Sequence, residues 1–327
     1  MGFVEIIGHT HQLEILRLAL ANDRLHHAYL FCGPAGVGKR TTALALAMAL
    51  HCAEKNGDFC GRCGECARIQ GRNHPDVRVI ECLAGKKEIS IQQIREMEKE
   101  LRFRSFSGGR KVAIVDPATL LNPASQNALL KTLEEPPPDS LLILVATSAG
   151  ALLPTLRSRC LRLGFGPLPR QLIARFLVSQ KLMKPADADL LAALGKGSLG
   201  AALQMNGEEL RQRRRIWGGM LSMLKVGDYR GAMEAAEALA ASREEALEFF
   251  EWAETWYHDL LIRALRQDSD DCVNLDMLVE LRRQAPAPME HILSAAANAA
   301  GAARKIQRNL NRRMVLERFL FGVVGSS

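Results

Sequence analysis

Short apolar runs alternate with segments of helical periodicity over the first half of the chain. The runs are too short for helices and predict strands, while the segments between them carry apolar residues every three or four positions. The strands that we predict are Ala28–Phe31, Val77–Ile80, Val112–Val115, Leu142–Ala146 and Leu161–Leu163. This alternation favours an α/β fold with a mostly parallel, covered sheet.

Local signals mark the ends of two helices in this half. Ser90-Ile91-Gln92-Gln93 has the spacing of a capping box and predicts a helix that runs toward Leu101. Asn122 followed by Pro123 predicts the start of a second helix, which the prolines at 136–138 should end.

The strand signals stop after Leu163, and the rest of the chain is predicted to be helical. Glycines and prolines at 164–169 indicate a linker, and a chain of 327 residues is too long for a single core. We therefore predict a sheet domain at 1–164, a small helical lid domain at 165–206 and an all-α bundle at 207–327. The aromatic residues expected to anchor that bundle are Trp217, Phe249, Phe250, Trp252 and Trp256.

Composition and charge restrict the class of protein without identifying it. Hydrophobic residues make up 48% of the chain and charged residues 24%, as in ordinary globular proteins. A net charge of +7 and a pI near 9.1 suit contact with nucleic acid or an acidic partner. We see neither a membrane span nor a signal sequence, so we expect a cytoplasmic protein whose cysteines are reduced or bound to metal.

A glycine-rich loop follows the first predicted strand. The run Gly33-Pro34-Ala35-Gly36-Val37-Gly38-Lys39 precedes a helix-favouring segment, a context in which backbone N–H groups converge on phosphate oxygens. The glycines allow close approach of the backbone, and the lysine supplies a charge for the terminal phosphates. The loop predicts binding of ATP or ADP through Gly33, Gly36, Gly38 and Lys39.

Two positions that handle metal and water in P-loop ATPases are altered. Arg40 stands where a Ser or Thr hydroxyl binds Mg²⁺, and Thr41 comes one residue later. Asp116 ends a strand, as does the Mg²⁺-orienting carboxylate of such enzymes, although a strand-end cap is an equal alternative. Pro117 stands where many of these ATPases have a glutamate that polarises water. We assign Arg40, Thr41 and Asp116 to the nucleotide site and expect neither Mg²⁺ binding nor efficient turnover.

Four cysteines lie within fifteen residues after the predicted P-loop helix. Cys52, Cys60, Cys63 and Cys66 have a C-x₇-C-x₂-C-x₂-C spacing, which lets successive thiolates face one tetrahedral ion. We predict a structural zinc module at 52–66, with tight turns at Gly61 and Gly64; iron or a metal-free loop are the alternatives. We interpret His74 as a histidine of a surface loop rather than a ligand.

Two further motifs make the chain similar to a known family. Asn122–Pro138, which reads NPASQNALLKTLEEPPP, and Thr155–Cys160, which reads TLRSRC, resemble segments of the bacterial clamp-loader subunits of the AAA+ family. The inserted cysteine module is also a trait of that family. The resemblance implies an AAA+ P-loop domain and places the C-terminal bundle in a collar with other subunits.

The resemblance also implies roles for single residues. Arg159 matches the arginine that reaches into a neighbouring subunit's ATP site, and Thr147 matches the polar sensor position near the terminal phosphate. Gly200 stands where ATP-hydrolysing relatives carry a nucleotide-contacting arginine. These features together predict a non-motor subunit. Its expected partners are the gamma/tau and delta subunits, a sliding clamp and primed DNA, with no membrane.

Two alternatives stay open. One is an ATP-hydrolysing subunit of the gamma/tau type, in which Thr41 supplies the hydroxyl. The other is a zinc-bearing DNA-binding module. Basic residues form two groups, and the second has near-helical spacing that suits phosphate or an acidic partner helix, with a solvated helix face as the alternative. The first group is Arg211, Arg213, Arg214 and Arg215, and the second is Arg304, Lys305, Arg308, Arg312 and Arg313.

Overall fold

The computed structural model describes residues 2–54, 57–266, 272–284 and 288–325. The chain forms two compact units, one made of Met1–Met183 with Gly195–Gln204 and the other of Lys184–Leu194 with Met205–Ser327. The predicted lid segment, 165–206, therefore supplies residues to both units. Helices α7 (Arg170–Lys181) and α9 (Leu199–Gln204) belong to the first unit and α8 (Pro185–Leu194) to the second. The domain boundaries drawn from the sequence stay a prediction.

The first unit is built on a parallel sheet of five strands in the order β2-β3-β4-β1-β5. The predicted strands are confirmed to within two residues at each end. The strands are β1 (Ala28–Cys32), β2 (Val77–Ile80), β3 (Lys111–Val115), β4 (Ser140–Ala146) and β5 (Leu161–Gly164). The predicted α/β P-loop class is confirmed.

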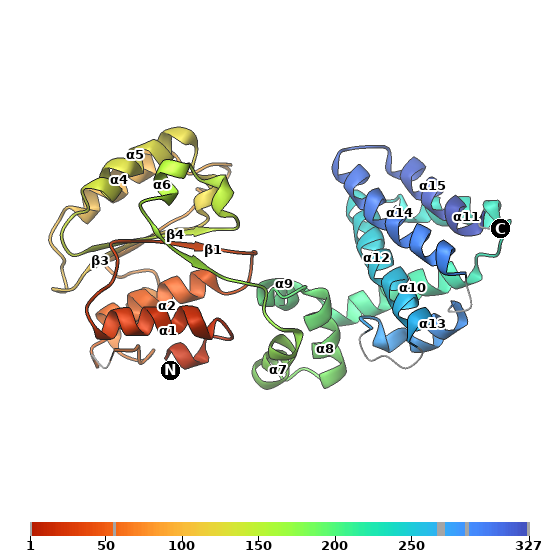
Figure 1. Cartoon of the computed structure of the whole chain (residues 1–327), viewed down its shortest axis with the longest axis horizontal. Coiled ribbons are helices and arrows are strands. Elements are labelled where there is room, and N and C mark those ends of the chain that lie inside the picture. The colour runs from red at the N-terminus through yellow and green to blue at the C-terminus, as the bar shows by residue number, and fades with distance from the viewer. Residues whose placement is uncertain (1, 55–56, 267–271, 285–287, 326–327) are drawn as a thin grey trace. The chain divides into compact units, whose positions relative to one another are not determined.

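Helices cover both faces of this sheet (Figure 1). One face packs against α1 (Thr10–Ala21), α2 (Lys39–His51) and the short α3 (Gly64–Gln70) and buries Phe31. The opposite face packs against α4 (Ile91–Leu101), α5 (Pro123–Glu134) and α6 (Pro154–Arg157) and buries Leu30. Neighbouring residues of a strand point to opposite faces, so a strand covered on both sides is apolar throughout.

The two predicted helix starts are confirmed in atomic detail. The Ser90 hydroxyl accepts from the Gln93 N–H at 3.3 Å, and the Gln93 side-chain oxygen accepts from the Ser90 N–H at 3.1 Å, which completes the capping box of α4. The Asn122 side chain accepts from the Ser125 N–H at 2.9 Å and caps α5, which ends at Glu134 before the prolines. In both helices the side chain of the cap residue accepts a hydrogen bond from a first-turn N–H group that has no partner within the helix.

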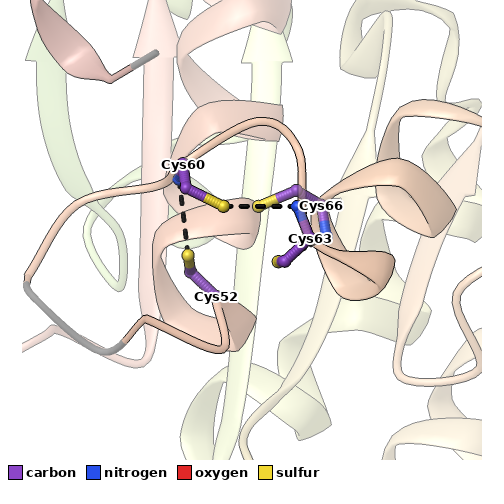
Figure 2. Close-up of side chains that lie close together, drawn as sticks. All are labelled: Cys52, Cys60, Cys63 and Cys66. Carbon is purple, nitrogen blue, oxygen red and sulfur yellow. Dashed lines mark hydrogen bonds between the residues drawn. The ribbon is translucent and has the colours of Figure 1, made fainter.

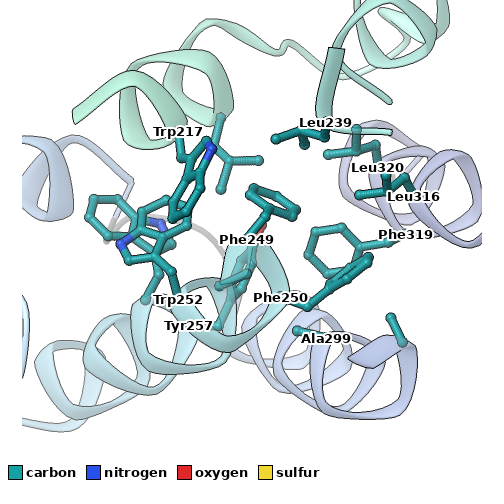
Figure 3. Close-up of a cluster of buried hydrophobic side chains, with 14 of the residues drawn as sticks. Trp217, Leu239, Phe249, Phe250, Trp252, Tyr257, Ala299, Leu316, Phe319 and Leu320 are labelled. Atoms are coloured by element: carbon teal, nitrogen blue, oxygen red, sulfur yellow. The ribbon is translucent and has the colours of Figure 1, made fainter. Parts of the chain in front are cut away.

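The second unit is a helical bundle with an aromatic core (Figure 3). All five predicted anchors are buried in it, and the Trp217 and Phe249 rings meet edge to face at 5.8 Å. Small residues of α14, including Ala299 and Ala302, lie in the same core and permit close packing. Besides α8, its helices are α10 (Gly207–Met223), α11 (Tyr229–Leu239), α12 (Arg243–Leu265), α13 (Leu278–Gln284), α14 (Met289–Gln307) and α15 (Arg312–Val324).

Several of the basic residues considered for phosphate binding pair within the bundle. Arg213 forms ion pairs with Glu209 and Glu248. Arg214 is 1% exposed and donates to Asn274 at 2.5 Å and to Asp276 at 3.1 Å. Arg214 serves the packing of the bundle, because a buried guanidinium must be paired. Arg213, whose side chain is 40% exposed, pairs at the surface of the bundle. In the described part of the chain, no helix has both the length and the apolar character that crossing a bilayer requires.

Candidate nucleotide site and metal centre

A cavity of about 560 Å³ opens at the carboxyl ends of the central strands, within the first unit. This volume lies in the usual range for small-ligand sites. The loop after β1 forms one wall, the ends of β3 and β4 form a second, and α9 forms a third. Of the sequence-predicted nucleotide residues, those that line the cavity are Gly36, Gly38, Lys39, Arg40, Thr41, Asp116 and Thr147.

Gly33 is the predicted residue that does not line this cavity; it lies at the start of the loop. A side chain there would place its Cβ 1.9 Å from the carbonyl oxygen of Phe165, so the position requires glycine for packing. Its N–H donates to the Ala146 carbonyl at 3.2 Å and ties the loop to β4. Gly33 thus shapes the loop from outside the cavity.

Lys39 is buried at the start of α2. Its amine donates to the loop carbonyls of Gly33, at 2.7 Å, and of Pro34. Burial lowers the pKa of Lys39, and the nearby Asp116 carboxylate opposes that shift. The N-cap residue of α2, Gly38, offers no side-chain hydrogen bond, so the first N–H groups of the helix are left for a ligand.

Arg40 occupies the place of the metal-binding hydroxyl and is already paired. Its Nη1 donates to Asp116 Oδ2 at 3.2 Å and to Glu81 Oε1. Burial raises the pKa of Asp116, and Arg40 opposes this shift. Burial likewise raises the pKa of Glu81, but Arg40 and Arg72 together hold it below the ordinary value. Asp116, which matches the Mg²⁺-orienting carboxylate of P-loop ATPases, is thus already paired with the Arg40 guanidinium. The contact between Glu81 and Arg40 was not predicted, because no local sequence pattern links two residues so far apart along the chain.

Helix α9 closes on the phosphate loop through two glycines. The Gly200 N–H donates to the Gly36 carbonyl at 2.8 Å, and a Cβ on Gly200 would lie 2.9 Å from the Gly36 Cα. Gly36 has a φ of +70°, and a Cβ there would meet the Ser198 hydroxyl at 2.3 Å. An arginine at position 200 would therefore force the two segments apart. The sequence lacks this arginine, and in the structure the backbones of Gly36 and Gly200 fill the space that its side chain would need.

Arg159 lies just after α6, on the first unit and away from the cavity-lining residues. Its Nη2 pairs with Glu134 Oε1 at 2.7 Å, and its Nη1 donates to the Thr155 carbonyl at 2.9 Å. The side chain is 36% exposed, and so is partly open to a partner. Burial raises the pKa of the adjacent Cys160 to about 12, which disfavours its thiolate form.

The four clustered cysteines converge on one point, as Figure 2 shows. Their sulfur atoms all lie within 4.8 Å of one another, and three of the four residues are buried. Sulfur ligands about 2.3 Å from a tetrahedral zinc lie about 3.8 Å apart, so the arrangement suits a single ion. Gly61 has a φ of +68° and makes a tight turn, as predicted; Gly64 does not, because it begins α3.

Backbone N–H groups also point at these sulfurs. The N–H of Cys60 donates to Cys52 at 3.4 Å, that of Cys63 to Cys60 at 3.3 Å, and that of Cys66 to Cys63 at 3.5 Å. The N–H groups of Cys66 and Ala53 lower the pKa of Cys63 to about 6, whereas burial raises the pKa of Cys66 to about 12. A divalent cation would supply the charge that allows all four to be thiolates. The donor set therefore fits a metal.

A polar cluster that sequence reasoning missed adjoins the cysteine module. His74 is buried, not on the surface as predicted, and its Nε2 lies 2.9 Å from Glu65 Oε2. Its ring lies against that of His51, with the ring centroids 4.5 Å apart and the planes tilted by 53°. Asp76 is also buried and accepts bonds from Ser105, Phe106 and Ser107. The hydrogen bonds to Asp76 hold the loop that precedes β3. The residues of this cluster are far apart along the chain and meet only in the folded structure.

We predict that Asp76→Asn destabilises the first unit by about 1–3 kcal/mol, because an amide nitrogen would then face donors. Burial raises the pKa of Asp76, but the hydrogen bonds from Phe106, Ser107 and Ser105 hold it well below its usual range. A depressed pKa contributes stability that is fully present above the unfolded value of about 3.9 and is lost as the pH falls through the folded value. Urea unfolding at neutral and acidic pH measures both effects; equal stability of variant and parent at neutral pH would contradict the prediction.

The parallel sheet, the phosphate loop after β1 and the helices beyond the sheet define an AAA+ P-loop protein. A family profile described as "DNA polymerase III, delta subunit" matches residues 8–169. The delta-prime subunit of DNA polymerase III from Pseudomonas aeruginosa is 34% identical over 257 residues, covering 77% of this chain and 76% of that protein. The delta-prime subunit from Escherichia coli is 34% identical, covering 73% and 71%. The chain belongs to the delta-prime family of DNA polymerase III subunits.

Subunits of a second type are also similar. The gamma/tau subunit from Mycobacterium tuberculosis is 32% identical over 255 residues, which cover 75% of this chain and 44% of that protein. The delta-prime relatives thus match over most of their own length, whereas the gamma/tau relative extends well beyond the match. The match lengths favour the delta-prime assignment over the gamma/tau alternative.

Proposed function

We propose that this chain is a non-motor subunit of the DNA polymerase III clamp loader. It would help to load the sliding clamp onto primed DNA while neighbouring subunits hydrolyse ATP. The observation that carries the proposal is the pairing of Arg40 with Asp116 and Glu81 at the place where an ATPase holds Mg²⁺. Pro117, at the water-polarising position, and Gly200, at the arginine position, support the same conclusion. A site altered at these three places keeps a shape that suits a ligand but lacks the groups that hydrolysis needs.

The proposed partners are the gamma/tau and delta subunits. Contact through the C-terminal bundle, as part of a collar, and through the AAA+ domain follows from the family resemblance. In that arrangement Arg159 would reach the ATP site of a neighbour, where a planar and permanently charged guanidinium stabilises charge on the transferring phosphoryl group. The partial exposure of Arg159 supports this role.

The cysteine cluster would hold a structural zinc ion. Four sulfur ligands leave no open position for substrate, so the ion would stabilise the segment between α2 and β2. Iron is the alternative that the donor set also allows, and metal analysis of the purified protein distinguishes the two.

The isolated chain is expected to show no ATP hydrolysis above background, and Lys39→Ala is expected to leave that result unchanged. The reason is that Arg40 occupies the metal position and Pro117 has no acid or base function. A steady-state ATPase assay with and without Mg²⁺ tests this. Metal-dependent turnover that Lys39→Ala abolishes would instead support the ATP-hydrolysing gamma/tau alternative.

A zinc-bearing DNA-binding module is the other alternative from the sequence. The ion pairs of Arg213 and the burial of Arg214 weigh against a free basic surface at that cluster. Tight DNA binding by the isolated chain at moderate salt, without partner subunits, would favour this alternative.

A further inference from the structure

The first residues of the chain are held by the segment that carries the four clustered cysteines. In that segment, Asp58 accepts from the Phe3 N–H at 3.0 Å and from the Phe59 N–H at 2.8 Å. Phe3 is 1% exposed, and its ring meets the Phe59 ring edge to face with the centroids 5.7 Å apart. A Cβ on Gly2 would lie 2.6 Å from the Asp58 carboxylate. The start of the chain is thus packed against the cysteine segment.

A few residues later the chain contacts the phosphate loop. His9 directly precedes α1, and its Nε2 lies 2.8 Å from the Val37 carbonyl oxygen. A carbonyl oxygen only accepts, so Nε2 carries the proton in this bond. In the described part of the chain, Gly36 and Gly38 line the loop's cavity, whereas His9 and the buried Val37 do not. His9 therefore holds the loop from outside the cavity.

This bond sets the orientation of one peptide group of the loop. The Val37 carbonyl and the Gly38 N–H belong to one trans peptide unit, in which they point in opposite directions. With the carbonyl bound to His9, the Gly38 N–H points away from His9. Gly38 has a φ of +112° and no side chain to restrain this peptide. His9 is thus a positioning residue for a backbone donor at the cavity wall.

Two further contacts fix the same stretch of chain near His9. Gln12 Nε2 donates to the Gly164 carbonyl, and the His9 and Phe165 rings lie 4.9 Å apart with their planes at 65°. Between the two ends Val4 is 86% exposed, so the order of the stretch depends on its end contacts. We call residues 2–12 the N-terminal strap. The strap contacts the cysteine segment at one end and the phosphate loop at the other, all within the first unit.

We propose that the N-terminal strap couples the cysteine segment to the phosphate loop, so that loosening the segment releases the loop. This inference goes beyond the proposed clamp-loader role and takes from the proposed function only the metal at the cysteine cluster. Metal bound by four cysteines contributes folding free energy to the segment that holds them. Without it, Asp58 and Phe59 no longer hold Phe3 in place, and the strap loses its first contact. His9 then no longer restrains the Val37 carbonyl.

Hydrogen–deuterium exchange of the full chain, with metal bound and after chelation under reducing conditions, tests this coupling. We expect the N–H groups of residues 3–12 and 33–39 to exchange at least about tenfold faster after chelation. Helix α5, on the opposite face of the sheet, and α12, in the second unit, are internal references that should change less than about twofold. Unchanged exchange of 33–39, or equal acceleration throughout the first unit, would overturn the proposal.

Phe59→Ala tests the first contact of the strap without altering a cysteine. The variant removes the ring that covers Phe3. We expect it to keep the parent's metal content and to raise the exchange of residues 3–12 and 33–39 at least about fivefold. Metal content equal to the parent's, together with parent-like exchange of the loop, would contradict the coupling.

His9→Ala tests the second contact of the strap. We expect faster exchange of residues 33–39 with unchanged exchange of residues 57–66, and chelation should then accelerate the loop by less than about twofold more. His11→Ala removes an exposed histidine of α1 and is the matched control, which should keep both the parent's loop protection and its response to chelation. Circular dichroism verifies that the variants are folded. Parent-like loop exchange in His9→Ala would remove the role of His9.

The outcomes separate this inference from the proposed function. ATP turnover by the isolated parent chain contradicts the non-motor function, whatever the exchange rates are. Absence of metal from the purified protein contradicts the zinc site, and Phe59→Ala and His9→Ala then still decide whether the strap couples the two segments. Bound metal with loop exchange that is indifferent to chelation contradicts only the coupling.

Discussion

Replacing Arg159 with alanine is expected to slow ATP hydrolysis at the neighbouring subunit's site by about a thousandfold or more, without loss of subunit association. A guanidinium supplied in trans stabilises charge that develops only in the transition state, so its removal affects rate more than binding. In the structure Arg159 pairs with Glu134 and caps α6 through the Thr155 carbonyl, and neither contact belongs to the core. Pre-steady-state hydrolysis by the reconstituted assembly measures the effect as the loss of one site's contribution.

Two variants test whether the guanidinium itself acts. Arg159→Lys keeps the charge but not the planar fork, and should recover only a small part of the rate. Glu134→Gln removes the internal partner of Arg159 and should leave the rate unchanged or raise it. An assembly containing Arg159→Ala that hydrolyses ATP at the parent's rate would remove the proposed role.

Replacing Cys60 with serine is expected to abolish stoichiometric metal binding and to lower the free energy of unfolding by about 3 kcal/mol or more. The other three sulfurs would then lack a fourth thiolate, and two of them belong to the buried residues Cys52 and Cys66. A metal held by these cysteines would also join the end of α2 to the start of α3, so its loss should loosen both. Elemental analysis and urea unfolding, before and after chelation, measure the two effects.

Cys82→Ser is the matched control. Cys82 lies outside the cluster, and its sulfur donates to the Lys86 carbonyl at 3.0 Å, a bond that a hydroxyl can replace. This variant should keep the metal and the parent's stability. Unchanged metal content and stability in Cys60→Ser would show that the cluster is not a metal site.

The sequence predicted the regular elements well because their signals are local. The capping box at Ser90 and the cap at Asn122 act within one helical turn, and the apolar central strands β1, β3 and β4 are buried on both faces. His74 was wrongly placed at the surface because its partners Glu65 and His51 lie on other elements. A single histidine in a polar segment does not indicate from sequence that it will be buried in a polar cluster.

For the site, the sequence by itself determined which groups are present: the phosphate loop, Arg40 in place of a hydroxyl, Pro117 in place of a glutamate, and four cysteines at metal spacing. Residue identity alone fixes which functional groups are available to bind phosphate or metal. The tertiary structure alone decided the partners of Arg40, because Glu81 and Asp116 directly follow the neighbouring strands β2 and β3 and so meet it at the carboxyl ends of the sheet. It also decided that α9 meets the loop through Gly36 and Gly200. Contacts between distant segments depend on how the sheet and helices pack, and local sequence patterns do not encode that packing.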